Sequence, residues 1–208
     1  MKHITLKKFL SMALAVCMVL SLAAFASAAN TVESSGGTGE SAVTLSSTED
    51  GSIGGTPAAT RMSVTVPTVL PVAIGTDGAV STATDAKIVN NSFGAVRIAS
   101  VSVQAASGWN LTAFGDKATL AHEKVDSNQC GFALSIGGGQ QKQTDTSDKT
   151  LQQLISEPEA GCYMSGSGDA SANSVAIAYD AIVTPVSEAV TNVPIASVLF
   201  IIEWDTAA

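Results

Sequence analysis

The chain has 208 residues, of which 46% are hydrophobic and 13% charged, and its formal net charge is −8. A polyanion of this kind repels nucleic-acid phosphates, which argues against a function in DNA or RNA binding. Charged residues are scarce beside Ala, Ser, Thr, Val and Gly, a mixture that favours strands and turns, and the length suffices for one domain with a hydrophobic core.

The first 29 residues have the order of segments that is typical of a secretory signal peptide. Met1–Lys8 carries three lysines and no acidic residue, Phe9–Phe25 is almost wholly apolar, and Ala26–Ala29 supplies small residues for cleavage. The alternative is an uncleaved membrane anchor, but an apolar run of about 17 residues is short for that. We therefore expect residues 1–29 to be removed and the protein to be secreted and associated with the cell surface.

Cleavage would also change the charge and the membrane topology. Of the 10 basic residues, loss of three lysines would leave 7 against 18 acidic ones, so the mature chain would have a net charge of −11. The longest later apolar run, Val198–Ile202, has the length of a strand and is far too short to cross a bilayer. No transmembrane anchor is expected in the mature chain.

Residues 30–60 are rich in Ser, Thr and Gly and carry only acidic charges. A segment with so little apolar surface is expected to be a flexible arm. Within it, Val43, Thr44 and Leu45 have weak strand character. An isolated strand in an arm could pair with a sheet elsewhere, so these three residues are a candidate donor strand.

From residue 61 onward, apolar and polar residues alternate with period two, which indicates half-buried strands. The main segments with this pattern are 62–66, 69–74, 80–89, 96–111, 132–136, 175–183 and 197–204. The phase shifts between Ile98 and Val101, which predicts a β-bulge near Ala99-Ser100. Residues 61–208 are therefore predicted to form an all-β domain, an antiparallel β-sandwich of about seven or eight strands.

One short helix is predicted between the strand segments 132–136 and 175–183. Its apolar face would consist of Leu151, Leu154 and Ile155. Ser147 or Asp148 can cap the start of such a helix, and Pro158 would end it.

The mature chain would keep two cysteines, Cys130 and Cys162. An even pair in an exported protein is often a disulfide, and we expect one here. The alternative is a pair of buried free thiols. Neither cysteine has a CxxC neighbour or a nearby histidine, so a zinc site or a catalytic thiol is not expected.

No convincing catalytic centre is present. The segment from His122 to Asp126 begins like the HExxH zinc motif, but Asp126 stands where the second histidine is needed. Glu157 and Glu159 could form a carboxylate pair only if the fold set them at a suitable separation. We therefore expect no catalytic residue, no metal, no cofactor and no enzymatic activity.

The two tryptophans carry a resemblance to a known family. Trp109-Asn110-Leu111 lies in the middle of the predicted domain, and Trp204 lies in its last strand, followed by Asp205-Thr206 rather than by a leucine. This layout resembles the WxL surface proteins of Gram-positive bacteria. The resemblance implies non-covalent attachment to cell-wall peptidoglycan, with Trp109, Leu111 and Trp204 as binding residues. The alternative is that both tryptophans are core aromatics.

The sequence thus supports two functional hypotheses. The first is a secreted cell-surface module, structural or binding, whose partners are cell-wall glycan or other surface proteins. The second is an extracellular fibre subunit that assembles by donor-strand exchange, in which the arm of residues 30–60 fills an incomplete sheet of the next copy.

Overall fold

The computed structural model describes residues 45–53, 55 and 58–206 and divides the chain into two units, 1–57 and 58–208. The predicted signal peptide and most of the predicted arm lie outside the described residues. In the first unit, residues 48–52 form a turn in which the Asp50 carboxylate accepts hydrogen bonds from the backbone N–H and the hydroxyl of Ser52. All the strands of the described residues lie in the second unit.

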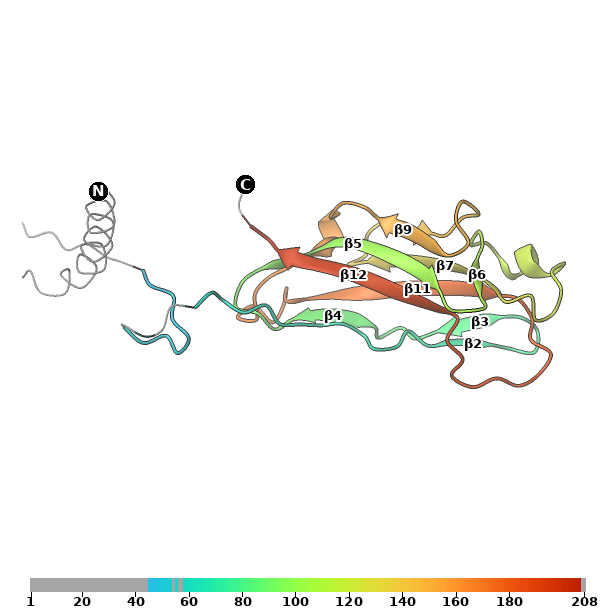
Figure 1. The fold of residues 1–208 in the computed structure, drawn as a ribbon, viewed down its shortest axis with the longest axis horizontal. Coiled ribbons are helices and arrows are strands. Elements are labelled where there is room, and N and C mark those ends of the chain that lie inside the picture. Colours follow the sequence, from blue (N-terminus) through green and yellow to red (C-terminus); the bar gives the residue numbers. More distant parts are fainter. Residues whose placement is uncertain (1–44, 54, 56–57, 207–208) are drawn as a thin grey trace, which may run out of the picture. The chain divides into compact units, whose positions relative to one another are not determined.

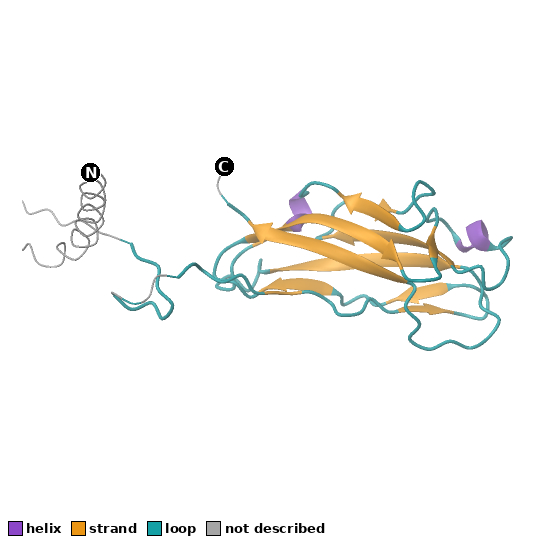
Figure 2. Ribbon diagram, viewed as in Figure 1, coloured by secondary structure: helices purple, strands orange, loops and turns teal. Residues whose placement is uncertain are grey.

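The second unit is nearly all β and consists of two main sheets and a hairpin (Figures 1 and 2). The larger sheet contains, in spatial order, β1 (Val64–Thr65), β4 (Lys87–Asn90), β11 (Ser174–Val183), β7 (Gln129–Ile136) and β6 (Asn110–Leu111), with β8 (Lys142–Gln143) also paired to β7. The smaller sheet contains β10 (Tyr163–Met164), β5 (Val96–Ala105) and β12 (Ala196–Trp204), with β9 (Leu151–Ile155) also paired to β5. The hairpin joins β2 (Val72–Ile74) to β3 (Val80–Thr82).

The predicted all-β class and antiparallel pairing are confirmed. Among the described residues, the only parallel pair is the short one between β6 and β7. The described residues contain twelve strands rather than seven or eight, because the predicted segments 80–89 and 96–111 each divide into two strands and because β8, β9 and β10 were not predicted as strands. Pro67 and Pro71 cannot donate backbone hydrogen bonds, and strands β1 and β2 are correspondingly short pieces on either side of them.

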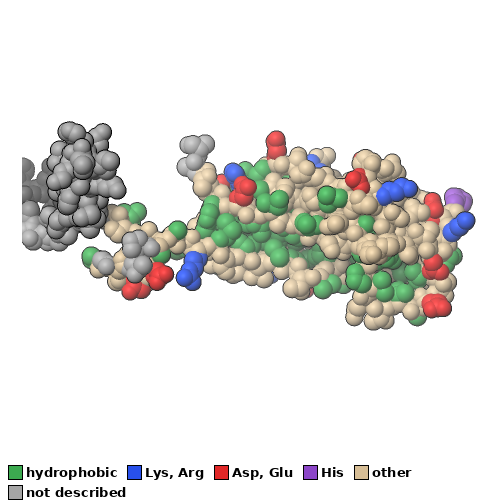
Figure 3. Space-filling view, viewed as in Figure 1, with side chains coloured by type: hydrophobic (Ala, Val, Ile, Leu, Met, Phe, Trp, Pro, Cys, Tyr) green, Lys and Arg blue, Asp and Glu red, His purple; other side chains and the backbone are tan. Residues whose placement is uncertain are grey.

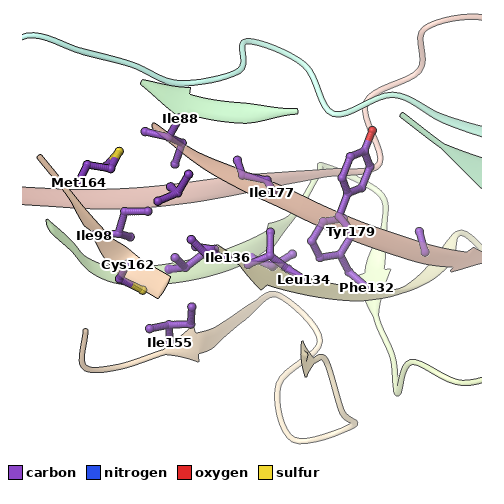
Figure 4. Close-up of a cluster of buried hydrophobic side chains, with 14 of the residues drawn as sticks. Ile88, Ile98, Phe132, Leu134, Ile136, Ile155, Cys162, Met164, Ile177 and Tyr179 are labelled. Atoms are coloured by element: carbon purple, nitrogen blue, oxygen red, sulfur yellow. The ribbon is translucent and has the colours of Figure 1, made fainter. Parts of the chain in front are cut away.

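The core lies between the two main sheets and is built from the alternating residues of β5, β7 and β11. Figure 4 shows these side chains pointing toward one another, with Leu134 and Ile136 of β7 close to Ile177 of β11. At one end the rings of Phe132 and Tyr179 stack with centroids 6.1 Å apart. Burial of these apolar side chains is the main favourable contribution to folding.

The hydroxyl of Tyr179 fastens the β2–β3 hairpin to this core. It donates a hydrogen bond to the backbone oxygen of Pro71 at 2.8 Å and accepts one from the backbone N–H of Ala83 at 3.1 Å. A buried tyrosine hydroxyl needs such partners, and here they come from both ends of the hairpin. The hairpin is therefore attached to β11 by side-chain bonds as well as by apolar contact.

The predicted bulge in β5 is confirmed. In the ladder between β5 and β12, Ser100 pairs with Ile201 and Ile98 pairs with Ile202, so Ala99 is the extra residue. The bulge restores the inward direction of the side chains, because Ile98 and Val101 are both fully buried although they are three residues apart. The phase shift in the sequence was thus a direct sign of the bulge.

The predicted helix over Leu151–Ile155 is wrong, because this segment is strand β9. The side chain that decides the outcome is Gln152, which is buried and turned toward the preceding loop. Its amide nitrogen donates to the backbone oxygens of Asp145 at 2.9 Å and Asp148 at 2.6 Å, and its oxygen accepts from the backbone N–H of Asp145 at 2.8 Å. The helical segments of the described domain are two 3-10 turns, Lys117–Leu120 and Ala160–Cys162. No helix of the described residues is long and apolar enough to cross a membrane.

The expected disulfide is also wrong, because Cys130 and Cys162 are free and buried. Cys130 is near the start of β7, whereas Cys162 packs beside Ile136 at the other end of that strand (Figure 4). Six residues of extended chain separate the two positions by about 20 Å. A disulfide requires Cα atoms within about 7 Å, so the fold keeps these two thiols apart.

Both thiols are expected to be unreactive in the folded protein. Burial raises the pKa of Cys130 to about 11 and also raises the pKa of Cys162, so neither forms the reactive thiolate near neutral pH. Iodoacetamide at about pH 8 should leave the native mature chain unmodified and add two groups after denaturation without reductant, as measured by mass spectrometry. Adducts that form only after reduction would show that the thiols are bonded.

Candidate functional site

The two long sides of the sandwich differ, and one of them is closed by the chain itself. Residues 142–155 pass from β8 in the larger sheet to β9 in the smaller one. Along this passage Thr144 is buried, and its hydroxyl donates to the backbone oxygen of Thr112 at 2.7 Å and accepts from the N–H of Phe132 at 2.8 Å. Together with the Gln152 bonds described above, these contacts give the buried polar groups of the closed side their partners.

The other side of the smaller sheet ends at β12. Among the described residues, this strand pairs with β5 alone, along its whole length from Ala196 to Trp204 (Figure 1). It is nine residues long and contains no proline and no glycine. We call its unpaired border the β12 edge.

The register fixes which backbone groups point to the β12 edge. The N–H of Ala106 donates to the oxygen of Ile195, and the N–H of Asp205 donates to the oxygen of Ala95, so both ends of the strand show the same phase. Hydrogen-bonding direction alternates along an antiparallel strand, so the backbone N–H and C=O groups of odd-numbered residues bond to β5 and those of even-numbered residues point to the β12 edge. The residues whose backbone groups face the edge are Ala196, Val198, Phe200, Ile202 and Trp204.

The same five residues direct their side chains toward the core, yet the core does not cover them completely. In the neighbouring strand β5, Val96, Ile98, Val101 and Val103 have no exposed surface. In β12, Val198, Phe200 and Ile202 pack against that core but are only partly buried. Solvent exposure therefore rises from β5 to β12, which means that the interior of the sandwich is open along the β12 edge.

The centre of the outer face of β12 is also apolar. Leu199 is 44% exposed and Ile201 is 56% exposed, and Figure 3 shows apolar side chains gathered in the strip of surface along this strand. Its single charged residue, Glu203, forms an ion pair with Arg97 at 3.2 Å. Another strand could therefore contact β12 through its backbone polar groups and through the side chains of both its faces.

A long edge strand with this many apolar residues is unusual, because natural sheets normally protect their edges with short strands, bulges, prolines or charges. The other borders of the smaller sheet follow that rule. On the far side of β5, β10 has two residues, and β9 has five residues and a register shift near Ile155. The β12 edge is therefore the candidate functional site, and it is suited to the addition of a strand.

The three residues predicted to bind cell wall do not come together in the structure. Leu111 is buried in the core, whereas Trp109 and Trp204 are partly buried and pack against its margins. Trp204 pairs with Val96 at one end of β5, and Trp109 follows the other end of that strand, roughly 30 Å away for an extended segment of this length. The two indole rings therefore belong to different ends of the sandwich.

The ring of Trp204 has a close neighbour in the turn between β4 and β5. A Cβ atom added to Gly94 would lie 3.0 Å from its Cζ3 atom, so the indole covers the backbone of that glycine. Trp204 thus covers the start of β5 and ends the apolar row of the β12 edge. Only glycine lets the ring come so close.

The predicted donor strand falls mostly outside the described residues. Val43 and Thr44 are not described, and Leu45 is not in a strand and is 98% exposed. Its apolar side chain is therefore exposed to solvent.

Several acidic residues of the loops accept hydrogen bonds from groups of the loops. The pKa values of Asp145 and Asp169 are lowered by hydrogen bonds, first from the side chains and then from the backbone N–H groups of Ser147 and Ser171. The Asp126 carboxylate accepts from the hydroxyl and the N–H of Ser187, which lowers its pKa and fastens two loops together. This bonding gives Asp126 a structural role, and His122 nearby is exposed.

Glu159, a candidate acid of the sequence, forms an ion pair with Lys142 at 2.6 Å, so its carboxylate has a cationic partner. An open pocket of about 720 Å³ lies between the β2–β3 turn, the first 3-10 turn and residues 183–189. Within the described part of the chain, no three His, Cys, Asp or Glu side chains come close enough to hold a metal ion.

Comparison of the chain with family models, with curated proteins and with solved structures gives no match. The resemblance to WxL proteins therefore rests on the residues around Trp109 and Trp204. The β12 edge has to be interpreted from its own geometry.

Proposed function

We propose that this protein is a secreted structural subunit whose copies join by strand addition at the β12 edge. The observation that carries the proposal is the nine-residue strand that, among the described residues, pairs on one side only and carries apolar side chains on its inner face and at the centre of its outer face. An added strand would bond to the outward backbone groups and cover the partly buried side chains of Val198, Phe200 and Ile202.

The charge distribution supports assembly through this surface rather than through the rest of the molecule. The mature chain is strongly acidic, which keeps copies apart over most of their surface. The β12 edge is the exception, since its single acid, Glu203, already has Arg97 as a partner. Contact between copies is therefore least opposed by charge where the sheet is open.

Wall attachment by the WxL mechanism receives less support. It would require Trp109 and Trp204 to act as two separate contacts at opposite ends of the domain, with Leu111 held in the core. Cell-wall glycan is the partner that the WxL resemblance implies, and sedimentation with purified walls is the direct assay for it.

The proposal is tested by placing charges on the β12 edge. The double variant Leu199→Lys/Ile201→Lys changes two exposed side chains, and lysine on an edge strand opposes the approach of another strand. Light scattering and sedimentation velocity of the mature chain should show concentration-dependent association that is lost in the double variant.

Leu151→Lys is the matched control, since Leu151 is 48% exposed and lies on β9, the edge strand on the other side of β5. This control should associate like the parent. A parent chain that stays monomeric at every concentration, or equal association of all three proteins, would refute the proposal.

A further inference from the structure

We propose that the strand added at the β12 edge is β12 of a second copy, in antiparallel register about a twofold axis at Phe200. The inference rests on the proposed function and identifies the partner of the same site. It follows from the order of side chains along Ala196–Trp204, which fits its own reverse.

The inward row is self-complementary in this register. The residues whose backbone groups face the edge lie opposite one another in the two copies. Phe200 is therefore opposite Phe200 of the second copy, and Val198 is opposite Ile202. At the ends, the small Ala196 meets the large Trp204, which avoids two bulky side chains or two small ones in one place. All five residues are partly buried already, and a second β12 would cover them with apolar side chains of the same kind.

The side chains on the outer face of β12 also fit this register. Leu199 lies opposite Ile201 of the second copy, and the twofold axis produces this pair twice. Aliphatic pairs opposite each other on one face are among the contacts that stabilise antiparallel strands. The two exposed apolar residues of β12 therefore cover each other, which accounts for their presence on a solvent-facing surface.

Charge does not oppose this pairing. Glu203 lies opposite Ser197 rather than opposite another acid, and it retains its ion pair with Arg97. Like charges directly opposite each other destabilise a strand pair, and the twofold register contains none. A shift of the register by two residues about Leu199 would leave Glu203 and Trp204 beyond the paired region and lose these contacts.

The alternative occupant is the arm segment Val43-Thr44-Leu45 of a second copy. It offers two apolar residues to an edge with nine positions, and Leu45 is not in a strand. A second β12 offers apolar side chains along nearly the full length of the edge. We therefore assign the site to β12 and keep the arm as an outcome of the test.

Cysteine cross-linking in the mature chain tests both the partner and the register. In the proposed register Leu199 is opposite Ile201 of the other copy in a non-hydrogen-bonded pair, with Cα atoms about 4.5 Å apart, a distance that a disulfide spans. Under mild oxidation, an equal mixture of Leu199→Cys and Ile201→Cys chains should form disulfide-linked dimers, and each variant alone should not.

Controls make the outcomes distinct. The parent should not cross-link, because Cys130 and Cys162 are buried, and a pair of Leu151→Cys chains should not cross-link either. Cross-linking of Leu199→Cys alone or of Ile201→Cys alone would show a shifted register and overturn the inference.

The arm variant Val43→Asn/Leu45→Asn separates this inference from the broader proposal. It should associate like the parent if β12 is the partner. If it dissociates and the cysteine mixture does not cross-link, the arm is the donor, so the inference falls while strand addition at the β12 edge stands. If neither the arm variant nor the charged β12 variant changes association, both are wrong.

Discussion

Replacing Leu134 by alanine is expected to lower the free energy of unfolding by about 2–5 kcal/mol, the range for large-to-small changes in a packed core. Leu134 is fully buried and lies in the middle of β7, where it pairs with Tyr179 of β11 and Lys142 of β8. Neighbours held on both sides by strand ladders have little freedom to collapse into the cavity. Urea unfolding followed by tryptophan fluorescence would measure the loss.

The matched control is the same substitution at Leu199, which is 44% exposed on the outer face of β12. Leu199→Ala should lower the stability of the monomer by less than about 1 kcal/mol, because little apolar surface is returned to water. The comparison should be made at concentrations low enough to exclude association. Equal losses at both positions would mean that β7 is not at the centre of the core.

The strands were predictable because local alternation records which face of a sheet is buried. Phe132, Leu134 and Ile136 alternate before a run of glycines, and the structure has β7 ending at Ile136 with Gly137 and Gly138 at positive φ. Even the bulge at Ala99 was visible, since an extra residue leaves a phase shift in the sequence. These features depend on neighbours within a few residues of the chain.

Segment 151–155 shows where local pattern stops being enough. Leu151, Leu154 and Ile155 fit a helical face, and Asp148 does act as an acceptor at the start, taking hydrogen bonds from the N–H groups of Thr150 and Leu151. The same cap precedes a strand here, because β5 offers a free border and Gln152 finds partners in the preceding loop. Short apolar runs are ambiguous in period, and tertiary pairing decides them.

The candidate site could not be located from sequence for a related reason. Alternation from Ala196 to Trp204 predicts a strand and its inward face, but not whether a neighbour lies on each side. That depends on β5, about a hundred residues earlier in the chain. Trp109 and Trp204 stand out in the sequence as rare residues. The feature that distinguishes the fold is instead a missing neighbour strand beside β12, whose own residues, such as Phe200, are common in strands.

The separation of Cys130 and Cys162 follows from the same long-range pairing. Both cysteines lie in or beside buried segments, and composition alone favours a bond in an exported chain. Their distance is set by β7, which carries Cys130 near its start and at its end contacts Gly161, the residue before Cys162. Packing and hydrogen bonds therefore stabilise the domain, and buried polar residues connect its segments where a disulfide was expected to do so.

Asn90 is the buried polar residue with the largest expected effect. It lies at the end of β4 with no exposed surface, and its amide nitrogen donates to the backbone oxygens of Gly94 at 2.9 Å and Ser165 at 2.8 Å. Its side-chain oxygen accepts from the N–H of Ser92 at 2.9 Å. One side chain thus fixes the turn that leads from the larger sheet to β5 and attaches it to the loop after β10.

Asn90→Ala would leave these three backbone groups without partners and is expected to lower the free energy of unfolding by about 3–5 kcal/mol, since each unsatisfied buried group costs about 1–3 kcal/mol. Asn90→Asp keeps the volume and the acceptor for Ser92 but turns the two donated bonds into contacts between carbonyl and carboxylate oxygens. Near neutral pH it should therefore be at least as destabilising as Asn90→Ala. Thermal and urea unfolding of the mature chain would measure both losses.

The neighbouring Asn91 provides the control, because it is exposed and its amide nitrogen donates to the hydroxyl of Thr65 at the surface. Asn91→Ala and Asn91→Asp should change stability by no more than about 0.5 kcal/mol, the usual range for exposed positions. If Asn90→Asp were as stable as Asn91→Asp, the amide would not be acting as a donor. The turn between β4 and β5 would then be held by Ser92, whose hydroxyl donates to the backbone oxygen of Ser63 and accepts from its N–H, and by the packing of Gly94 under Trp204.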